Sequence, residues 1–261
     1  MATTTGASGE GWRDYHRRVR PLPADIAAHV AAQIEGHDAR VLLLGVTRSY
    51  AELGAELTAV DWCPEQIANV WIGDGPGRTA VLADWREMDL GPERFTAALG
   101  DGSFSTLAWP EDYRRALARV AAALVPGGML AVRCFMAPDE PETIERIAGE
   151  VRAGRVESFY SARWRIAIAL AGSGNVAVTA IRDAFDSAFP DRMALAAATG
   201  WSANTIAEID AYRGSDLVYS FVTRSELVAL VSEVFDNPRF VSSGVYPRAE
   251  HYPLIVAERR P

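Results

Sequence analysis

Gly45 and Asp61 are the two residues whose types and spacing point most directly to chemistry. Gly45 closes the apolar run VLLLG, and Asp61 closes the next apolar run, LTAVD. Two such runs, the first ending in glycine and the second in an acid, are typical of a strand, a turn, a helix and a neighbouring strand. The glycine would turn the chain, and the acid would accept hydrogen bonds from two ribose hydroxyls. The pattern therefore predicts a nucleoside site.

The loop after Gly45 narrows the kind of nucleoside. A pyrophosphate site needs three glycines so that the backbone can approach the phosphates. Here Gly45 is followed by Val46, Thr47, Arg48 and Ser49. We therefore expect a ligand without a diphosphate, which makes a nicotinamide oxidoreductase the least favoured enzyme class.

The elements that must position these residues follow from the hydrophobic pattern. Strands are expected at residues 41–44, 57–61, 79–83, 95–99, 129–135, 240–246 and 254–258. Helices are expected at residues 25–33, 50–53, 64–70, 110–124 and 225–234, the last opened by the capping box Thr223-Arg-Ser-Glu226. This alternation predicts a parallel sheet, and the hairpin-like PRAEHYP suits an antiparallel last strand.

Residues 136–222 interrupt the alternation. Their pattern is mostly helical, with candidates at 142–149, 162–171 and 183–198, and we interpret the segment as a helical lid on the sheet. Residues 1–10 are small and polar and are expected to be a disordered tail. The remaining 11–261 would form one domain, with its core at 37–135 and 223–261.

Composition limits the partners. A net charge of -8 without a basic cluster argues against nucleic acid and favours a small molecule; a homodimer stays open. No apolar run is long enough to span a membrane and no secretion signal is evident, so a cytoplasmic protein is expected. All 26 basic residues are Arg, which excludes Schiff-base and pyridoxal-phosphate chemistry. Cys63 and Cys134 are expected to be buried thiols.

Four segments together resemble the class I S-adenosylmethionine-dependent methyltransferases. They are VLLLG at 41–45, AVDWCPEQI at 59–67, ADW at 83–85, and LGDGS at 99–103 followed by LVPGGMLAVRCF at 124–135. The resemblance spans 41–135 and 223–259. It implies an α/β, doubly wound, mostly parallel Rossmann-like sheet of seven strands with an antiparallel last strand. It also implies S-adenosylmethionine as cofactor and S-adenosylhomocysteine as product.

The resemblance carries over to cofactor-binding residues. Asp61 would bind the ribose, Asp84 the adenine amino group and Asp101 the ammonium, while Thr47 or Arg48 would hold the methionine end. Trp62 and Trp85 would flank the adenine or else cover the sheet edge. The full expected set is Gly45, Thr47, Asp61, Trp62, Ala83, Asp84, Trp85, Gly100, Asp101 and Gly102.

Methyl transfer by direct displacement depends mostly on positioning, and a base is needed only if the acceptor must lose a proton. Candidate catalytic residues are His16, Tyr15 and Tyr160, and candidate substrate-binding residues are Trp164, Arg165, Tyr212, Arg213 and Tyr219. Salt bridges within the lid are the alternative for Arg165 and Arg213. No carboxylate pattern indicates a metal site.

The leading hypothesis is methyl transfer to O, N or C of a small molecule. Two alternatives stay open. The fold could host a cyclisation or rearrangement without methyl transfer, or it could serve a non-catalytic partner protein.

Overall fold

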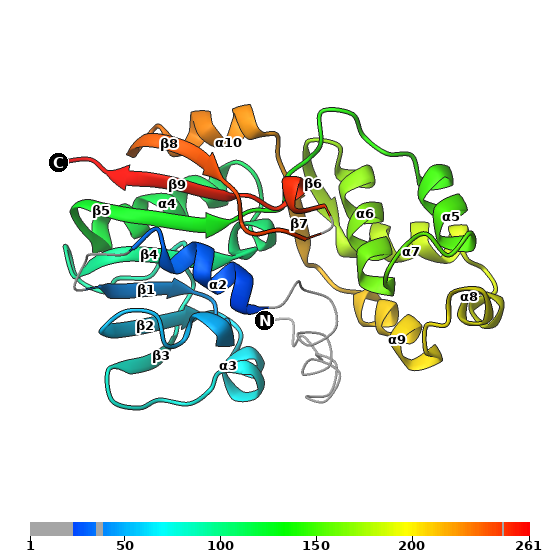
Figure 1. The fold of residues 1–261 in the computed structure, drawn as a ribbon, viewed down its shortest axis with the longest axis horizontal. Coiled ribbons are helices and arrows are strands. Elements are labelled where there is room, and N and C mark those ends of the chain that lie inside the picture. Colours follow the sequence, from blue (N-terminus) through cyan, green and yellow to red (C-terminus); the bar gives the residue numbers. More distant parts are fainter. Residues whose placement is uncertain (1–22, 35–38, 247) are drawn as a thin grey trace. The chain divides into compact units, whose positions relative to one another are not determined.

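A computed structural model describes residues 23–34, 39–246 and 248–261 of the chain. The expected tail, Tyr15 and His16 lie outside these described residues. The chain divides into two compact units. Of the described residues, those from 23 to 136 and from 223 to 261 belong to one unit, the sheet unit, and residues 137–222 belong to the other, the insertion unit (Figure 1).

The sheet unit is built on a seven-stranded sheet in the order β3-β2-β1-β4-β5-β9-β8. The strands are β1 (Arg40–Leu44), β2 (Glu56–Asp61), β3 (Arg78–Leu82), β4 (Phe95–Asp101), β5 (Leu124–Arg133), β8 (Phe235–Val241) and β9 (Leu254–Arg259). Strands β1 to β5 pair in parallel, whereas β9 is antiparallel to both of its neighbours. The predicted Rossmann-like sheet with an antiparallel last strand is confirmed.

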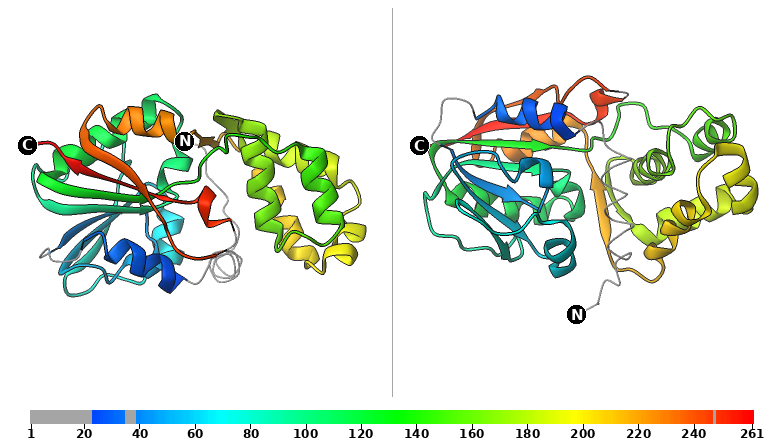
Figure 2. Two further views of the ribbon diagram at one scale, coloured as in Figure 1. Left: turned by 45° about the horizontal axis from the view of Figure 1, so that its top comes forward. Right: turned by 60° about the horizontal axis from the view of Figure 1, so that its bottom comes forward.

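The strands are apolar on both faces because helices cover both faces. Along β1, Val41 and Leu43 join a core cluster with Ile26 and Val30 of α2 (Pro23–Ala31), and the register places Val41 beside Leu57. On the other face α4 (Glu111–Ala123) packs on β5, and α10 (Arg224–Val231) packs on β8. Figure 2 shows α2 and α4 on opposite faces of the sheet.

The remaining helices of the sheet unit are short. They are η1 (Arg48–Tyr50), α3 (Pro64–Val70), η2 (Ser103–Thr106) and η4 (Ala249–His251). The expected helix 50–53 is instead the single turn η1, which begins two residues earlier. The capping box that opens α10 is confirmed, since Thr223 and Glu226 bond each other's backbone N–H groups.

Two strands differ from expectation in their bounds. The VPGG segment was expected to turn the chain before residue 129, but β5 already begins at Leu124, which pairs with Phe95 before the register shifts. Strand β8 runs from Phe235 rather than from residue 240, and a bulge between Asp236 and Arg239 accommodates Asn237 at φ 52° and Pro238. A proline is tolerated there because β8 is an edge strand.

The insertion unit is mostly helical, as the sequence pattern predicts. Its helices are α5 (Ile144–Arg152), α6 (Phe159–Ala171), α7 (Val178–Ala188), α8 (Arg192–Thr199), α9 (Ala203–Ala207) and η3 (Glu208–Tyr212). The single helix expected at 183–198 is two helices, because Pro190 ends the pattern and Asp191 caps α8.

A small sheet of the insertion unit was not expected. Strands β6 (Gly174–Ala177) and β7 (Val218–Phe221) pair in antiparallel fashion, and Val176 lies opposite Tyr219. The Ala137 N–H donates to the Val222 carbonyl at 3.0 Å, so the two ends of the inserted chain are bonded to each other. Among the described residues, no helix has the length and apolar character needed to cross a bilayer.

Candidate functional site

The site begins at Gly45, directly after β1. Gly45 has φ 100°, a conformation that side-chain-bearing residues rarely adopt. Its N–H donates to the Val60 carbonyl of β2 at 2.8 Å, and the indole N–H of Trp85 donates to the same oxygen at 2.6 Å. Gly45, β2 and the segment after β3 are therefore joined at one carbonyl, at the carboxyl edge of the sheet where open α/β folds bind ligands.

Asp61, the last residue of β2, faces Gly45. A Cβ at Gly45 would lie 3.9 Å from Asp61 Oδ2, while Oδ1 accepts a hydrogen bond from the Cys63 N–H at 2.9 Å. The Asp61 residue is 7% exposed, and burial raises the pKa of its carboxyl to about 6. The structure thus brings Gly45 and Asp61 together as predicted, with one carboxylate oxygen directed to the glycine side.

The two tryptophans differ in their surroundings. Trp62, directly after Asp61, is 41% exposed, whereas Trp85 is buried and its indole is held by Val60. Ala83, two residues before Trp85, donates its N–H to the Asp61 carbonyl at 3.0 Å. Trp62 is therefore available to cover a ligand, while Trp85 packs beneath the strand ends.

Asp84 is engaged by an arginine. Both of its oxygens accept hydrogen bonds from Arg86, at distances from 2.5 to 3.0 Å, and Arg86 also reaches Asp112 at 2.8 Å. The hydrogen bonds from Arg86 lower the pKa of the Asp84 carboxyl. Asp84 is thus an ionised member of a three-residue network that links the β3 end to α4.

Asp101, at the end of β4, is paired with Arg133 at the end of β5. Arg133 Nε lies 2.6 Å from Asp101 Oδ1, and Arg133 Nη1 donates to the Tyr246 hydroxyl at 3.2 Å. The Tyr246 hydroxyl in turn lies 2.6 Å from the Ser243 hydroxyl. Burial acts to lower the pKa of Arg133, but the Asp101 charge raises it overall. The Arg133 partner was not anticipated, although its position beside Asp101 in parallel register could have revealed it.

Gly100 and Gly102 flank Asp101 in tight surroundings. A Cβ at Gly100 would lie 2.7 Å from Ser103 Oγ, whose hydroxyl donates to the Leu44 carbonyl at 2.6 Å. A Cβ at Gly102, which has φ 69°, would lie 3.1 Å from the Phe135 ring. Both glycines allow this edge of β4 to approach β1 and β5 closely.

The loop after Gly45 forms a single turn of helix, η1. The Thr47 carbonyl accepts the Tyr50 N–H at 3.0 Å, which forms η1, and the Thr47 side chain makes no capping bond. Tyr50 is fully buried, whereas Arg48 is exposed. The loop therefore offers two side chains, Thr47 and Arg48, on its outer side.

In the insertion unit, two expected substrate residues form ion pairs. Arg165 contacts Glu142 at 2.5 Å and Glu150 at 2.6 Å, with 5% of its side chain exposed. Arg213, by contrast, is mostly exposed and lies 3.1 Å from Asp210. These ion pairs correspond to the alternative considered for both residues.

The aromatic candidates of the insertion unit lie close together. The Trp164 and Tyr219 rings are 5.2 Å apart, and the Tyr212 hydroxyl donates to the Tyr219 hydroxyl at 3.3 Å. The Tyr160 hydroxyl donates to Glu208 Oε1 at 2.9 Å. Glu208 was missed because it lies far along the chain from α6.

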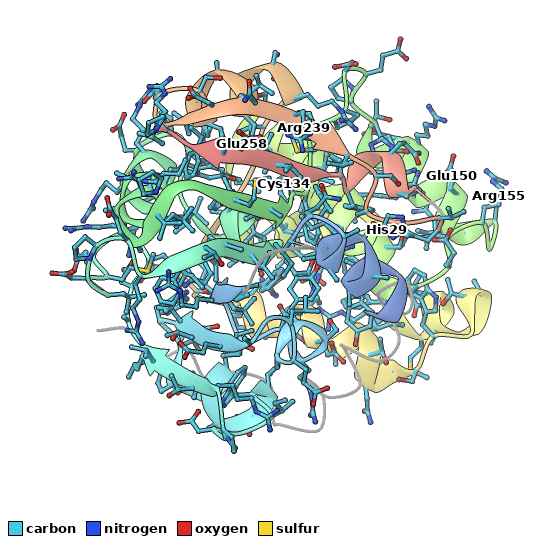
Figure 3. All side chains as sticks on the ribbon, turned by 60° about the vertical axis from the view of Figure 1, so that its left-hand side comes forward. His29, Cys134, Glu150, Arg155, Arg239 and Glu258 are labelled. Carbon is cyan, nitrogen blue, oxygen red and sulfur yellow. The ribbon has the colours of Figure 1, made fainter. Side chains whose placement is uncertain are left out.

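Neither cysteine is a ready nucleophile. Cys134 is buried directly after β5 (Figure 3), and burial raises the pKa of its thiol to about 12. Cys63 is half-buried, and burial raises its thiol pKa to about 11. The prediction of a buried thiol is thus confirmed for Cys134 and is wrong for Cys63, which is only half-buried because it lies after the end of β2, at the start of α3. Within the described part of the chain, no three His, Cys, Asp or Glu side chains gather in a metal-binding arrangement.

No protein-family model matches the chain, and no curated protein sequence is significantly similar to it. Solved structures are similar in fold. The Burkholderia thailandensis 1,6-didemethyltoxoflavin-N1-methyltransferase, with bound 1,6-didemethyltoxoflavin and S-adenosylhomocysteine, is 19% identical with a TM-score of 0.55, over 97% of this chain and 83% of that one.

Two further structures are similar. CalS10, a Micromonospora echinaspora amino pentose methyltransferase with S-adenosylmethionine bound, is 16% identical with a TM-score of 0.54 over 95% of each chain. A Rhodobacter sphaeroides protein provisionally described as a Zn-dependent alcohol dehydrogenase is 16% identical, with a TM-score of 0.57, over 98% of this chain and 99% of that one. At these identities the likeness establishes architecture. The chain has the fold of the class I S-adenosylmethionine-dependent methyltransferases.

Proposed function

We propose that this protein is an S-adenosylmethionine-dependent methyltransferase that acts on a small-molecule acceptor. The observation that carries the proposal is the pairing of Gly45 with Asp61, whose buried carboxylate directs Oδ2 to the side of Gly45. A carboxylate in this position can accept both hydroxyls of a ribose. The two similar methyltransferases named above, which hold S-adenosylhomocysteine or S-adenosylmethionine, support the same ligand.

The residues present fit this cofactor in three respects. S-adenosylmethionine carries no phosphate, so the loop after Gly45 does not need further glycines. Asp61 suits the ribose diol, and the exposed ring of Trp62 lies directly beyond it, where it can cover the adenine. Thr47 and Arg48 lie on the same loop as Gly45 and are proposed to hold the methionine end.

Asp84 and Asp101 are each held in place by an arginine and are proposed to contact the cofactor directly. Because Arg86 bonds both oxygens of Asp84, we propose that Asp84 contacts the adenine amino group only through a lone pair that Arg86 leaves available. Asp101, whose Oδ1 accepts a hydrogen bond from Arg133 Nε, is the proposed partner of the ammonium. Gly100, Gly102 and Ala83 would contribute backbone surface.

When bound, the cofactor supplies a methyl group on a positively charged sulfur. This chain's contribution is to align the acceptor atom behind that methyl group and to exclude water. If the acceptor must lose a proton, Tyr160 is proposed to take it while its own hydroxyl proton passes to Glu208, whose Oε1 lies 2.9 Å from that hydroxyl. His16 and Tyr15 remain proposals for the same task.

Calorimetric titration with S-adenosylmethionine and S-adenosylhomocysteine tests the cofactor. We expect Asp61→Ala to weaken binding at least tenfold, about 1.4 kcal/mol. Glu56→Ala is the matched control, because Glu56 is exposed at the opposite end of the same strand and should leave the affinity unchanged. Absence of binding by the wild-type protein at millimolar ligand would refute the proposal.

The mass of the product distinguishes methyl transfer from cyclisation or rearrangement. Incubation with candidate acceptors should add the mass of one methylene group, with conversion of the cofactor to S-adenosylhomocysteine. Turnover with unchanged product mass would favour cyclisation or rearrangement. Stable capture of another enzyme, together with failure to bind the cofactor, would favour a non-catalytic partner.

A further inference from the structure

Arg133 holds the turn after β4 with both its side chain and its backbone. Its Nε donates to Asp101 Oδ1 at 2.6 Å, and its carbonyl accepts the Gly102 N–H at 2.9 Å. The Arg133 Cζ also lies over the Phe135 ring at 5.4 Å, and a Cβ at Gly102 would lie 3.1 Å from the same ring. The end of β5 therefore fixes the position of Asp101 at the carboxyl edge of the sheet.

A chain of hydrogen bonds continues from the guanidinium of Arg133 into the connection between β8 and β9. Arg133 Nη1 donates to the Tyr246 hydroxyl at 3.2 Å, and that hydroxyl lies 2.6 Å from the Ser243 hydroxyl. The Ser243 hydroxyl donates to the Tyr252 carbonyl at 2.6 Å. This Arg133 network, formed by Asp101, Arg133, Tyr246 and Ser243, thus joins three segments that all belong to the sheet unit.

The chemistry of its two ends fixes the direction of every bond in this chain. A guanidinium can only donate hydrogen bonds, and a carbonyl oxygen can only accept them. Because Ser243 gives its one hydroxyl proton to the Tyr252 carbonyl, the Tyr246 hydroxyl must donate to Ser243. Neither hydroxyl then has a proton left to donate to a ligand. Tyr246 and Ser243 therefore influence a ligand site through Arg133.

Stability alone is a weak explanation for the Arg133 network. The side chains of Arg133 and Asp101 are only 3% and 4% exposed, and Ser243 is fully buried. Well-packed apolar side chains in place of a buried ion pair often give equal or greater stability. A buried network whose members are all bonded does, however, give each member one defined orientation. Its acidic member, Asp101, ends β4 at the edge where open α/β sheets bind ligands.

We propose that Arg133, Tyr246 and Ser243 are positioning residues, which hold the Asp101 carboxylate in the orientation that receives the ammonium of the cofactor. Arg133 acts directly on Asp101, while Tyr246 and Ser243 restrict the guanidinium to one orientation. Recognition of the amino-acid end of the cofactor then depends on the connection between β8 and β9. The inference rests on the proposed function, because it concerns how the cofactor of that reaction is recognised.

Calorimetric titration of the full chain with two nucleosides tests the inference. The probes are S-adenosylhomocysteine and its deamino analogue, which keeps the carboxylate and lacks only the ammonium. We expect the wild-type protein to bind S-adenosylhomocysteine about tenfold more tightly. Tyr246→Phe should reduce this preference by about threefold or more, without changing the affinity for the deamino analogue. Ser243→Ala should reduce the preference by less, since Ser243 is one bond further from Arg133.

Ser232→Ala is the matched control for Ser243→Ala. The Ser232 hydroxyl also donates to a backbone carbonyl, that of Val228 at 2.7 Å, but this bond lies at the end of α10 and outside the Arg133 network. The control variant should bind S-adenosylhomocysteine with the same preference as the wild type.

A double variant tests whether Tyr246 acts through Asp101. Asp101→Asn should remove the preference for S-adenosylhomocysteine, and adding Tyr246→Phe to it should change the ratio of the two affinities no further. A role in stability alone would not make the effect of Tyr246→Phe depend on Asp101. If Asp101→Asn does not fold, the comparison of Tyr246→Phe with the wild type still decides.

An unchanged preference in folded Tyr246→Phe would overturn the inference, as would an equal weakening of both nucleosides in this variant. Equal wild-type affinity for the two nucleosides would also overturn it and would leave the proposed function standing, because the cofactor would still bind. If the wild-type protein binds neither nucleoside at millimolar concentration, the proposed function fails and this inference fails with it.

Discussion

Arg133 Nε lies 2.6 Å from Asp101 Oδ1, with only 3% and 4% of the two side chains exposed. A pair this deeply buried is compensated only while both charges are present. Arg133→Met should therefore lower the free energy of unfolding by about 3–5 kcal/mol, because Asp101 would remain as an uncompensated buried charge. Urea unfolding measures the loss.

The double variant Asp101→Asn with Arg133→Met provides the control for this pair. It removes both charges at once, so it should recover most of the lost stability. The exposed pair Arg115–Glu87 should cost less than about 1 kcal/mol when broken. A loss that is simply additive in the double variant would contradict the coupling.

Asp61 gives the sheet unit a specific pH dependence. Its folded pKa of about 6 lies above the ordinary value of 3.8, so the folded state binds this proton more tightly than the unfolded state. The resulting stabilisation is complete below about pH 4 and is lost as pH rises through 6. Asp61→Asn should remove this dependence and raise stability at pH 8 by up to about 3 kcal/mol. Thermal melts at several pH values test it.

The Asp61 carboxyl should have the opposite effect on cofactor affinity, which should rise with pH as the carboxyl ionises. Ribose hydroxyls donate to an ionised carboxylate, so S-adenosylmethionine binding should weaken as pH falls below 6. The Asp61→Asn variant should bind S-adenosylmethionine weakly at every pH, although its folded state is more stable than that of the wild type at pH 8. Such a trade-off is expected where a binding site keeps a buried charge that lowers stability. A wild-type affinity independent of pH between 5 and 8 would contradict this role.

Trp62 and Trp85 should respond differently to truncation. Trp62→Ala removes an exposed ring and should weaken cofactor binding with little change in stability. Trp85→Ala should instead cost about 3–5 kcal/mol, because a buried ring and its bond to Val60 are lost. Calorimetric titration and urea unfolding of both variants measure the two effects. Equal loss of stability would contradict the assignment.

The cap of α10 offers a local test of the fold. Thr223 Oγ1 accepts the Glu226 N–H, and Glu226 Oε2 accepts the Thr223 N–H at 2.8 Å. Thr223→Ala should lower the free energy of unfolding by about 1 kcal/mol. Thr223→Ser keeps the hydroxyl and should remain close to wild type, so a similar loss in both variants would show that the methyl group matters instead.

The sheet was predictable because its information is local. Runs such as VLLLG and LTAVD mark buried parallel strands, and Gly45 and Asp61 each end one of them. The capping box at Thr223 is equally local. These signals were sufficient to place Gly45 beside Asp61, because the carboxyl ends of parallel strands share one edge.

What remained unpredicted depends on distant partners. Arg133 pairs with Asp101 from the neighbouring strand, and Arg86 bonds both Asp84 and Asp112. These contacts depend on which strands are neighbours and on how far each side chain reaches, which composition does not reveal. The hydrogen bond from Tyr160 to Glu208 joins residues 48 positions apart, so no local pattern predicted it. Strands β6 and β7 were missed because each has only four residues.

The backbone hydrogen bond between Ala137 and Val222 brings the two ends of the inserted segment together. Strand β5 ends just before this segment and α10 begins just after it, so the strand order β5-β9-β8 does not depend on the length of the inserted segment. Such an arrangement permits the whole segment to be exchanged during evolution, while the pairing of β1 with β2 keeps Gly45 and Asp61 next to each other. Replacement of the segment would then need recombination only at residues 137 and 222, without a single substitution in the sheet.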